Sequence, residues 1–313
     1  MTDITRLRII LASFLVVSIV SCRKTDDAPA PPKTGKLAVV ATLFPVYDFT
    51  RNIGGDKADI LLLLPPGTEA HSFEPRPGDF AAVKRASLFV YTGELMEPWA
   101  ADILKGVKND SLGVVDASKG VGMKQAEAHE GHDSHHGADP HIWLDFANAQ
   151  IMVDNIAEGF AEKDMANRDY YIKNAGDYKT KLAALDAGYT AALRSCKKKV
   201  FVHGGHYAFG YLARRYGLQY LSAAGLSPDS EPSPATMVEL VKLIRQNGLG
   251  AVFYEELIRP NVAETIAMET GAKLLPLHGA HNVTKDEYDN GVTFIALMGK
   301  NLERLKEGLE CDR

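Results

Sequence analysis

The sequence lacks the excess of positive charge that nucleic-acid-binding proteins carry. It holds 35 lysine and arginine residues against 40 aspartate and glutamate residues, for a formal net charge of −5 at neutral pH. The basic run 197–199 is only a triplet, which is typical of a solvated approach to a strand. Because neither a basic cluster nor interleaved aromatic and basic residues occur, we expect no nucleic-acid partner.

Long hydrophobic runs are missing after the first 22 residues, so no later segment is expected to span a membrane. At the N-terminus, Arg6 and Arg8 precede the apolar run 9–20, an order typical of a secretory signal peptide. The letters IVSC at 19–22 resemble a bacterial lipobox. They predict a signal over residues 1–22 and a lipid anchor on Cys22, with a plain signal anchor as the weaker alternative.

Apolar residues are almost absent from residues 23–36, where proline and charge dominate, and this composition predicts a flexible tether.

Cysteine is scarce as well, with three in 313 residues. If Cys22 carries lipid, Cys196 and Cys311 remain. In an oxidising envelope they can pair and tie the last helix to the start of the second domain, but the sequence leaves two free thiols open.

The chain is 46% hydrophobic and 24% charged, an ordinary globular composition, and its length suffices for two domains with their own cores. From residue 37 onward, short continuous apolar runs alternate with helical patterns. Such runs are typical of parallel strands covered on both faces, so we expect an α/β fold. The expected strands form two sets, over 37–44, 60–65, 87–93 and 112–118, and over 199–203, 218–223, 250–255 and 273–278.

A long amphipathic helix is expected between the two sets, because apolar residues recur there at alternating steps of four and three. The stripe consists of Tyr171, Ala175, Tyr178, Leu182, Leu185, Tyr189 and Ala192. A helix over 167–195 is about 40 Å long at 1.5 Å per residue. The sequence thus predicts lobes over 37–166 and 196–313, each a mostly parallel sheet flanked by helices, joined by one long rigid helix.

Histidines follow several of the expected strands. In open parallel sheets, ligands bind beyond the carboxyl ends of the strands, so two facing lobes would bring these histidines into one cleft. Imidazole nitrogens suit a borderline ion such as Zn²⁺, whereas Ca²⁺ prefers oxygen ligands. The histidines at strand ends are His71 and His141 in the first set, and His203, His206, His278 and His281 in the second.

Four motifs together resemble the zinc/manganese solute-binding proteins of ABC importers. They are PPGTEAHSFEPRP, DPHIWLDF after a histidine-rich loop, HYAFGYLARRYGL, and VFYEELIRPNVAETIAMETGAKLLPL. The resemblance covers about residues 37–309 and implies two α/β lobes joined by a long helix, with the metal in the cleft between them. It also implies that His71, His141 and His206 are metal ligands, which leaves His203 as a neighbour.

The fourth ligand departs from the family pattern, which usually supplies a carboxylate. Here the corresponding position falls on His281, with His278 as the alternative. Zinc-binding members resemble this chain in having histidine at the third position, whereas manganese-binding members tend to have a carboxylate there. The resemblance therefore favours Zn²⁺ as the bound ion over Mn²⁺.

The histidine-rich loop over 126–139 is expected to play an accessory part. His129, His132, His135 and His136 lie among acidic residues, in a stretch too polar to pack. As in the loops of zinc-specific relatives, they are expected to hold zinc weakly at the mouth of the cleft. The alternative is a solvated insert without a specific role.

Three carboxylates near the expected site have two interpretations each. Asp139 and Asp145 flank His141, and either could orient its imidazole, but Asp145 could instead cap the following helix. Glu255 ends a strand facing the cleft, where it could orient a ligand or offer a spare oxygen.

The expected function is that of the zinc-binding component of an ABC importer, which captures Zn²⁺ outside the cytoplasmic membrane. It implies an ABC permease and its ATPase as partners, a lipid-anchored position in the bacterial cell envelope, and a monomer. One alternative is a surface buffer or adhesin that binds manganese or another divalent metal. A zinc hydrolase is less expected, because the sequence has neither an HExxH helix nor a nucleophile elbow, and no enzymatic activity is predicted.

Overall fold

The computed structural model describes residues 35–126, 137–226 and 231–312. Within this part of the chain, all eight expected strands are present, and they form two four-stranded parallel sheets. The prediction of an α/β fold with two parallel-sheet lobes is confirmed. The strands are β1 (Leu37–Ala41), β2 (Ala58–Leu62), β3 (Leu88–Tyr91), β4 (Gly113–Asp116), β5 (Val200–His203), β6 (Gln219–Ser222), β7 (Ala251–Tyr254) and β8 (Lys273–Pro276).

The two sheets repeat one topology. Their strand orders are β2-β1-β3-β4 and β6-β5-β7-β8. In each lobe the first strand lies inside the sheet, the second forms one edge, and the third and fourth extend the sheet on the opposite side of the first. The central strand β3 is buried along its whole length, which explains its continuous apolar run. In both lobes the carboxyl ends of the strands point toward the other lobe, and this places the loops that follow them between the two sheets.

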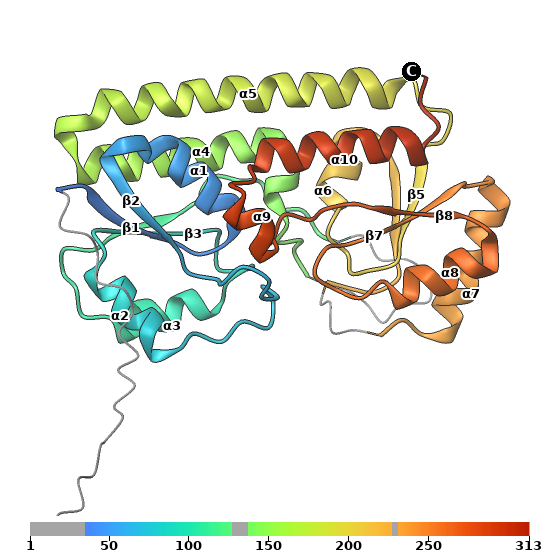
Figure 1. Cartoon of the computed structure of the whole chain (residues 1–313), viewed down its shortest axis with the longest axis horizontal. Helices are drawn as coiled ribbons and strands as arrows, with labels where there is room; N and C mark the ends of the chain where they lie inside the picture. The colour runs from blue at the N-terminus through green and yellow to red at the C-terminus, as the bar shows by residue number, and fades with distance from the viewer. Residues whose placement is uncertain (1–34, 127–136, 227–230, 313) are drawn as a thin grey trace, which may run out of the picture.

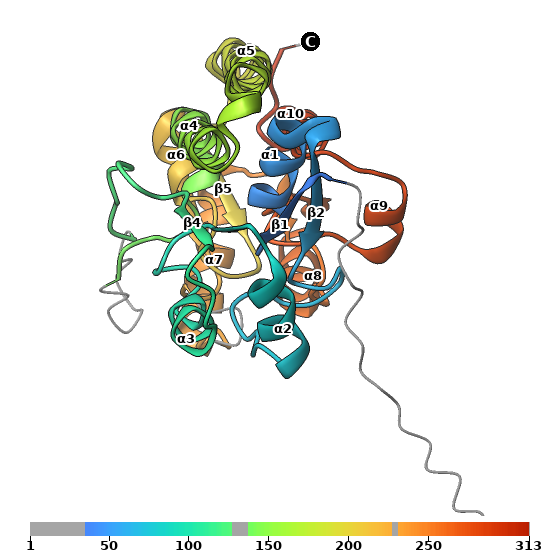
Figure 2. The same ribbon diagram turned by 90° about the vertical axis from the view of Figure 1, so that its left-hand side faces the viewer.

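Helices cover both faces of each sheet (Figure 1 and Figure 2). In the N-terminal lobe, α1 and α4 lie on the upper face and α2 and α3 on the lower face; in the C-terminal lobe, α6 and α10 lie above and α7 and α8 below. Their bounds are α1 (Phe44–Gly54), α2 (Pro77–Arg85), α3 (Trp99–Gly106), α4 (Phe146–Lys163), α6 (Gly210–Arg215), α7 (Pro234–Asn247), α8 (Asn261–Thr270), α9 (Lys285–Asp289) and α10 (Phe294–Gly308).

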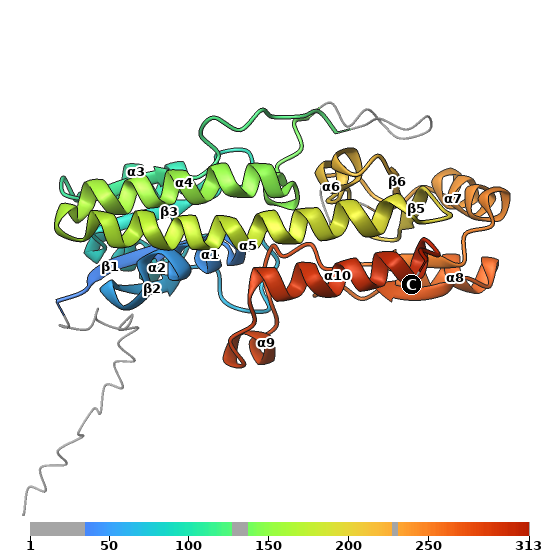
Figure 3. The same cartoon turned by 90° about the horizontal axis from the view of Figure 1, so that it is seen from above.

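The connecting helix α5 (Arg168–Arg194) runs along both lobes and packs on α1, α4 and α10 (Figure 3). Its expected apolar stripe faces these helices. Two tyrosines of the stripe also donate hydrogen bonds to the two lobes: Tyr178 to Asp48 of α1 at 2.8 Å, and Tyr189 to the carbonyl of Met298 of α10 at 2.6 Å. The helix is therefore fastened to both lobes along its length.

One hydrophobic core continues from the N-terminal lobe into the C-terminal lobe beneath α5. Phe146 of α4, Tyr189 of α5 and Phe294 of α10 meet within it as edge-to-face rings. A second core lies between the C-terminal sheet and helices α7 and α8. Because opening the lobes widely would break a shared, close-packed core, large hinge closure is disfavoured.

Cys196 and Cys311 form a disulfide in the structure, which answers the question that the sequence left open. It joins the end of α5 to the end of α10. No helix in the described residues is both long and apolar enough to cross a membrane. The expected signal peptide, Cys22 and the tether lie outside the described residues, except for the last two residues of the tether.

Candidate metal centre

The N-terminal lobe supplies His71 and His141 to a group of imidazoles between the lobes. His71 lies on the loop between β2 and α2, and His141 directly precedes a short 3-10 turn, Ile142–Leu144, that leads into α4. A carboxylate fixes the second imidazole, because Asp139 Oδ1 lies 2.8 Å from His141 Nδ1 and also accepts the backbone N–H of His141 at 3.0 Å. The other ring nitrogen, His141 Nε2, is thereby turned toward His71 and His206.

The C-terminal lobe supplies His206, three residues beyond β5. Glu255, which follows β7, holds it twice: Oε1 accepts the backbone N–H of His206 at 3.0 Å, and Oε2 lies 2.5 Å from Nδ1. Gly205 makes this approach possible, because a Cβ at that position would collide with the Glu255 carboxylate. Glycine is thus required here by close packing.

His281 comes from the loop between β8 and α9, late in the sequence, yet this loop is attached to the N-terminal lobe. Asn282 donates to the carbonyl oxygens of Pro65 and Thr68 at 2.7 and 2.9 Å, and the His281 carbonyl accepts the N–H of Phe44 at 3.3 Å. Three of the four histidines are therefore held on the N-terminal side, and His206 alone stands on the C-terminal side.

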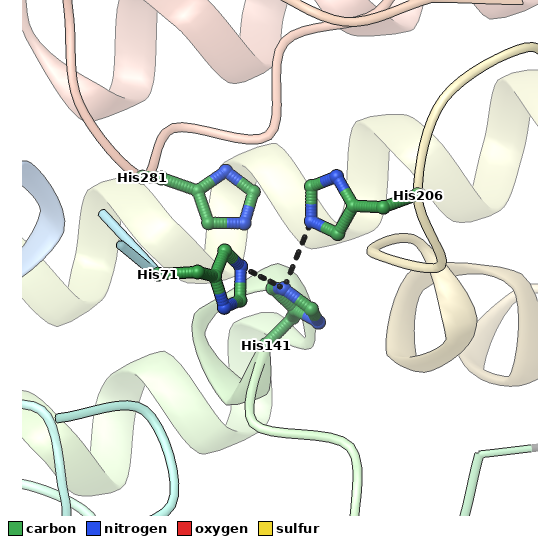
Figure 4. A group of neighbouring side chains, drawn as sticks. All are labelled: His71, His141, His206 and His281. Carbon is green, nitrogen blue, oxygen red and sulfur yellow. Dashed lines mark hydrogen bonds between the residues drawn. The ribbon is translucent and has the colours of Figure 1, made fainter. Parts of the chain in front are cut away.

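The four imidazoles converge on one point (Figure 4). One ligand nitrogen from each lies within 4.8 Å of the others. The His141 Nε2 atom is 3.4 Å from His71 Nε2 and 3.3 Å from His206 Nε2. A tetrahedral Zn²⁺ with Zn–N bonds of about 2.0–2.1 Å places its nitrogens about 3.3–3.4 Å apart, so these separations fit that ion. The group consists of His71, His141, His206 and His281.

Burial keeps two of these imidazoles in the neutral form that binds metal. His141 is fully buried, and burial holds its pKa well below the ordinary value, with the neighbouring histidines acting in the same direction. Burial likewise lowers the pKa of His71 to about 2. Because a metal ion competes with protons for the same lone pairs, a site of neutral imidazoles is ready to accept a cation.

Two of the imidazoles have a carboxylate against the ring nitrogen that faces away from the group, Asp139 at His141 and Glu255 at His206. Burial raises the pKa of Asp139 to about 7. Burial also acts to raise the pKa of Glu255, but His206 outweighs it and lowers that pKa overall. Burial alone would lower the pKa of His206, but the Glu255 carboxylate has the larger effect, so the pKa of His206 is raised overall. Both contacts agree with the expected orienting roles of Asp139 and Glu255.

Sequence reasoning missed Glu256, which follows Glu255 directly. Its Oε1 lies 3.5 Å from His281 Nδ1, and its Oε2 accepts the N–H of Gly279 at 2.7 Å. Burial acts to raise the pKa of Glu256, but His278 and His281 outweigh it and lower that pKa to about 2. Two consecutive acidic residues at a strand end were the available signal, and only one of them was considered.

Asp145 does not reach the imidazoles. Its Oδ1 accepts the N–H of Ala147 at 2.8 Å, which caps α4, and also pairs with Arg215 Nη1 at 2.8 Å. Of the two interpretations given above, the structure supports the helix cap. The mistaken alternative arose because Asp139 and Asp145 flank His141 in sequence, but the 3-10 turn carries Asp145 away.

His203 and His278 lie beside the group but outside it. The Nδ1 atom of each accepts a backbone N–H two residues onward, from Gly205 at 3.2 Å and from Ala280 at 2.9 Å. Burial lowers the pKa of His203 to about 4, so this residue is a neutral partner of its own turn. The structure therefore groups His281, and not His278, with the other three. The loop histidines His129, His132, His135 and His136 lie outside the described residues.

Two parallel-sheet lobes on a rigid helix, with four converging imidazoles between them, are typical of metal-binding proteins of the two-lobed solute-binding class. Residues 39–308 match the model of the family described as ZnuA, zinc-uptake complex component A, periplasmic. The chain belongs to this family.

Known relatives agree in sequence and structure. The chain is 39% identical over 308 residues to the high-affinity zinc uptake system protein ZnuA of Bacillus subtilis, and the match covers 96% of each chain. It is 34% identical to the zinc-binding lipoprotein AdcA of Streptococcus pneumoniae, of which it spans 60%. The crystal structure of the Zn(II)-bound ZnuA-like domain of that AdcA superposes with a TM-score of 0.75, covering 88% of this chain and 100% of the domain, at 34% identity.

Proposed function

We propose that this protein captures Zn²⁺ outside the cytoplasmic membrane and delivers it to the permease of an ABC importer. The observation that carries the proposal is the convergence of four imidazoles from distant segments on one point, with ligand nitrogens within 4.8 Å of one another. Membership of the zinc-uptake family and the zinc-bound state of the related AdcA domain support it.

Zinc is the ion that this donor set favours. Four nitrogen ligands suit a borderline ion that accepts tetrahedral geometry, whereas Mn²⁺ prefers oxygen donors. A catalytic zinc usually keeps one position open for water, but four protein donors fill a tetrahedral shell. We therefore assign His71, His141, His206 and His281 as the ligands of a transported ion, and no enzymatic step to this site.

Release requires that the ligand geometry be broken. His206 is held by Glu255 on the C-terminal side, while the other three imidazoles are held on the N-terminal side. A small shear between the lobes would withdraw His206 without opening the core beneath α5. His71 is the least buried of the four and lies on a loop, so displacement of this loop would open a path to solvent. We infer that permease docking triggers such a movement.

The proposal includes the expected position of the protein. A lipid on Cys22 and the tether over 23–36 would hold a monomer at the membrane, beside the permease and its ATPase. His129, His132, His135 and His136 would collect zinc weakly near the site. The division into lobes over 37–166 and 196–313, with the linker helix over 167–195, is part of the same proposal.

A competition titration of the purified protein against a chelator of known zinc affinity tests this function. We expect one tightly bound Zn²⁺ per chain, which persists when residues 127–136 are deleted and weakens by about 100-fold or more in His206→Ala, since four ligands share about 10–16 kcal/mol in structural zinc sites. Weak binding, or zinc lost together with the loop, would contradict the proposal and favour a surface buffer.

A further inference from the structure

We propose that Glu256 is a positioning residue that allows a fourth imidazole, that of His281, to serve as a zinc ligand in this chain. It orients His281 and supplies negative charge close to the ion without binding it. The inference rests on the proposed zinc function. It concerns the departure noted above, namely histidine at the position where the resemblance implies a carboxylate.

The first argument is the pairing of ligands with carboxylates. Asp139 faces Nδ1 of His141, and Glu255 faces Nδ1 of His206. Glu256 repeats this arrangement at His281, where its Oε1 lies 3.5 Å from Nδ1. The Nε2 atom of His281 is buried and has no hydrogen-bond partner among the described residues, so it is free to bind an ion. A carboxylate on Nδ1 fixes the tautomer that leaves Nε2 available.

The second argument separates His281 from His278, since both lie near the same oxygen. Glu256 Oε1 is 3.3 Å from Nδ1 of His278. His278, however, lies outside the group of converging imidazoles, and its Nδ1 also lies 2.9 Å from the backbone N–H of Ala280. Within the group, the imidazole that Glu256 contacts is that of His281, at 3.5 Å.

The third argument is backbone strain on both sides of the contact. Leu257 directly follows Glu256 with a φ of 64°, and Ala280 directly precedes His281 with a φ of 60°. Non-glycine residues rarely adopt this conformation, and each instance costs about 1–3 kcal/mol unless the surroundings enforce it. Two such residues next to one contact indicate that the fold enforces the approach of Glu256 to His281.

The fourth argument is charge. Four neutral imidazoles add nothing to offset a divalent cation in a buried site, whereas three imidazoles and a carboxylate ligand offset one charge. The Glu256 side chain is only 11% exposed and accepts one N–H from Gly279 at 2.7 Å, which ties the C-terminal lobe to the segment held by the N-terminal lobe. It therefore supplies the missing negative charge without entering the ligand shell.

A double-mutant cycle tests the inference with zinc itself as the probe. Glu256→Gln keeps the shape of the side chain and an oxygen for Gly279 but removes the charge. We expect it to weaken zinc binding by about 10–100-fold, the usual effect of losing such a partner. In the His281→Glu chain, which restores an acidic ligand, the two carboxylates would repel one another. There, Glu256→Gln should leave zinc affinity unchanged or increase it.

This dependence of the effect on the residue at position 281 distinguishes positioning from a structural role, since a merely structural Glu256 would weaken both chains alike. Glu287→Gln is the matched control: Glu287 caps α9 beside His278, glutamine can serve in the same cap, and zinc affinity should stay within about threefold. Equal weakening in both backgrounds, or no effect of Glu256→Gln on the parent chain, would overturn the inference. Absence of tight zinc in the parent chain would instead overturn the proposed function.

Discussion

The indole N–H of Trp143 donates a hydrogen bond of 2.8 Å to the carbonyl of Gly279, which lies 136 residues further along the chain. Trp143 follows His141 by two residues, and Gly279 precedes His281 by two. The bond therefore joins the two segments that present these imidazoles. The Trp143 ring also contacts both, with centroid separations of 5.6 Å to His141 and 5.3 Å to His281.

Trp143→Phe should destabilise the protein by about 1–3 kcal/mol, because it leaves the buried Gly279 carbonyl without its donor. Urea unfolding of the metal-free protein measures this change. Trp99→Phe is the matched control, because the indole nitrogen of Trp99 has no hydrogen-bond partner among the described residues. Zinc affinity should fall in Trp143→Phe and stay unchanged in Trp99→Phe. Equal behaviour of the two variants would show that the bond to Gly279 does not order the site.

The identity of the fourth ligand can be tested by two single substitutions. His281→Ala should weaken zinc binding by about 100-fold or more, since it removes one of four nitrogens that share the binding free energy. His278→Asn should change it by less than about threefold, because an asparagine oxygen can accept the N–H two residues onward, as Nδ1 of His278 does from Ala280. Chelator competition measures both. The reverse ranking would assign the ligand to His278.

Glu97 should make stability depend on pH. This carboxyl group is fully buried, and burial raises its pKa from 4.5 to about 7. The folded state holds the Glu97 proton more tightly than the unfolded state does. The free energy of unfolding is therefore unaffected below pH 4.5, falls as the pH rises from 4.5 to 7, and is lower by about 3 kcal/mol above pH 7.

Glu97→Gln removes this cost, and its amide oxygen can still accept the N–H of Thr92. We expect the variant to gain about 3 kcal/mol over the parent chain between pH 5 and pH 8. Urea unfolding of both proteins across that range gives the difference directly, and other titrating groups cancel in it. A difference that stays constant with pH would contradict the assigned pKa.

The disulfide should contribute to stability but not to metal binding. It closes a sequence separation of 115 residues. Replacing Cys196 and Cys311 together by serine should therefore cost about 2–5 kcal/mol, because the unfolded chain regains the entropy of an open loop. Unfolding without reductant measures this cost, and reduced parent protein should behave like the variant. Zinc affinity should be unchanged, since the disulfide lies at the far ends of α5 and α10.

The sequence was sufficient to predict the two sheets, because parallel strands buried on both faces appear as continuous apolar runs. It also placed the four histidines of the group among the six that follow strands, and three of the four match family motifs. The local patterns could only place these histidines at strand ends, whereas the fold brings them together. Deciding between His281 and His278 required the structure, because both follow β8.

Other features depend on contacts that no local pattern records. The segment that follows β8 belongs by sequence to the second lobe, yet Asn282 binds Pro65, and Arg51 of α1 donates to the Val292 carbonyl at 2.7 Å. The approach of Glu256 to His281 likewise depends on turns with unusual backbone angles. Such long-range pairings are set by packing, so sequence periodicity cannot reveal them.

The most direct test of the account is a crystal structure of the zinc complex, with the ion located by its anomalous scattering. We expect one Zn²⁺ between the lobes, bonded at about 2.0–2.1 Å to one nitrogen each of His71, His141, His206 and His281, with Glu256 against the far nitrogen of His281. A zinc ion bound to His278, to a carboxylate oxygen or to water in place of His281 would contradict the four-imidazole site.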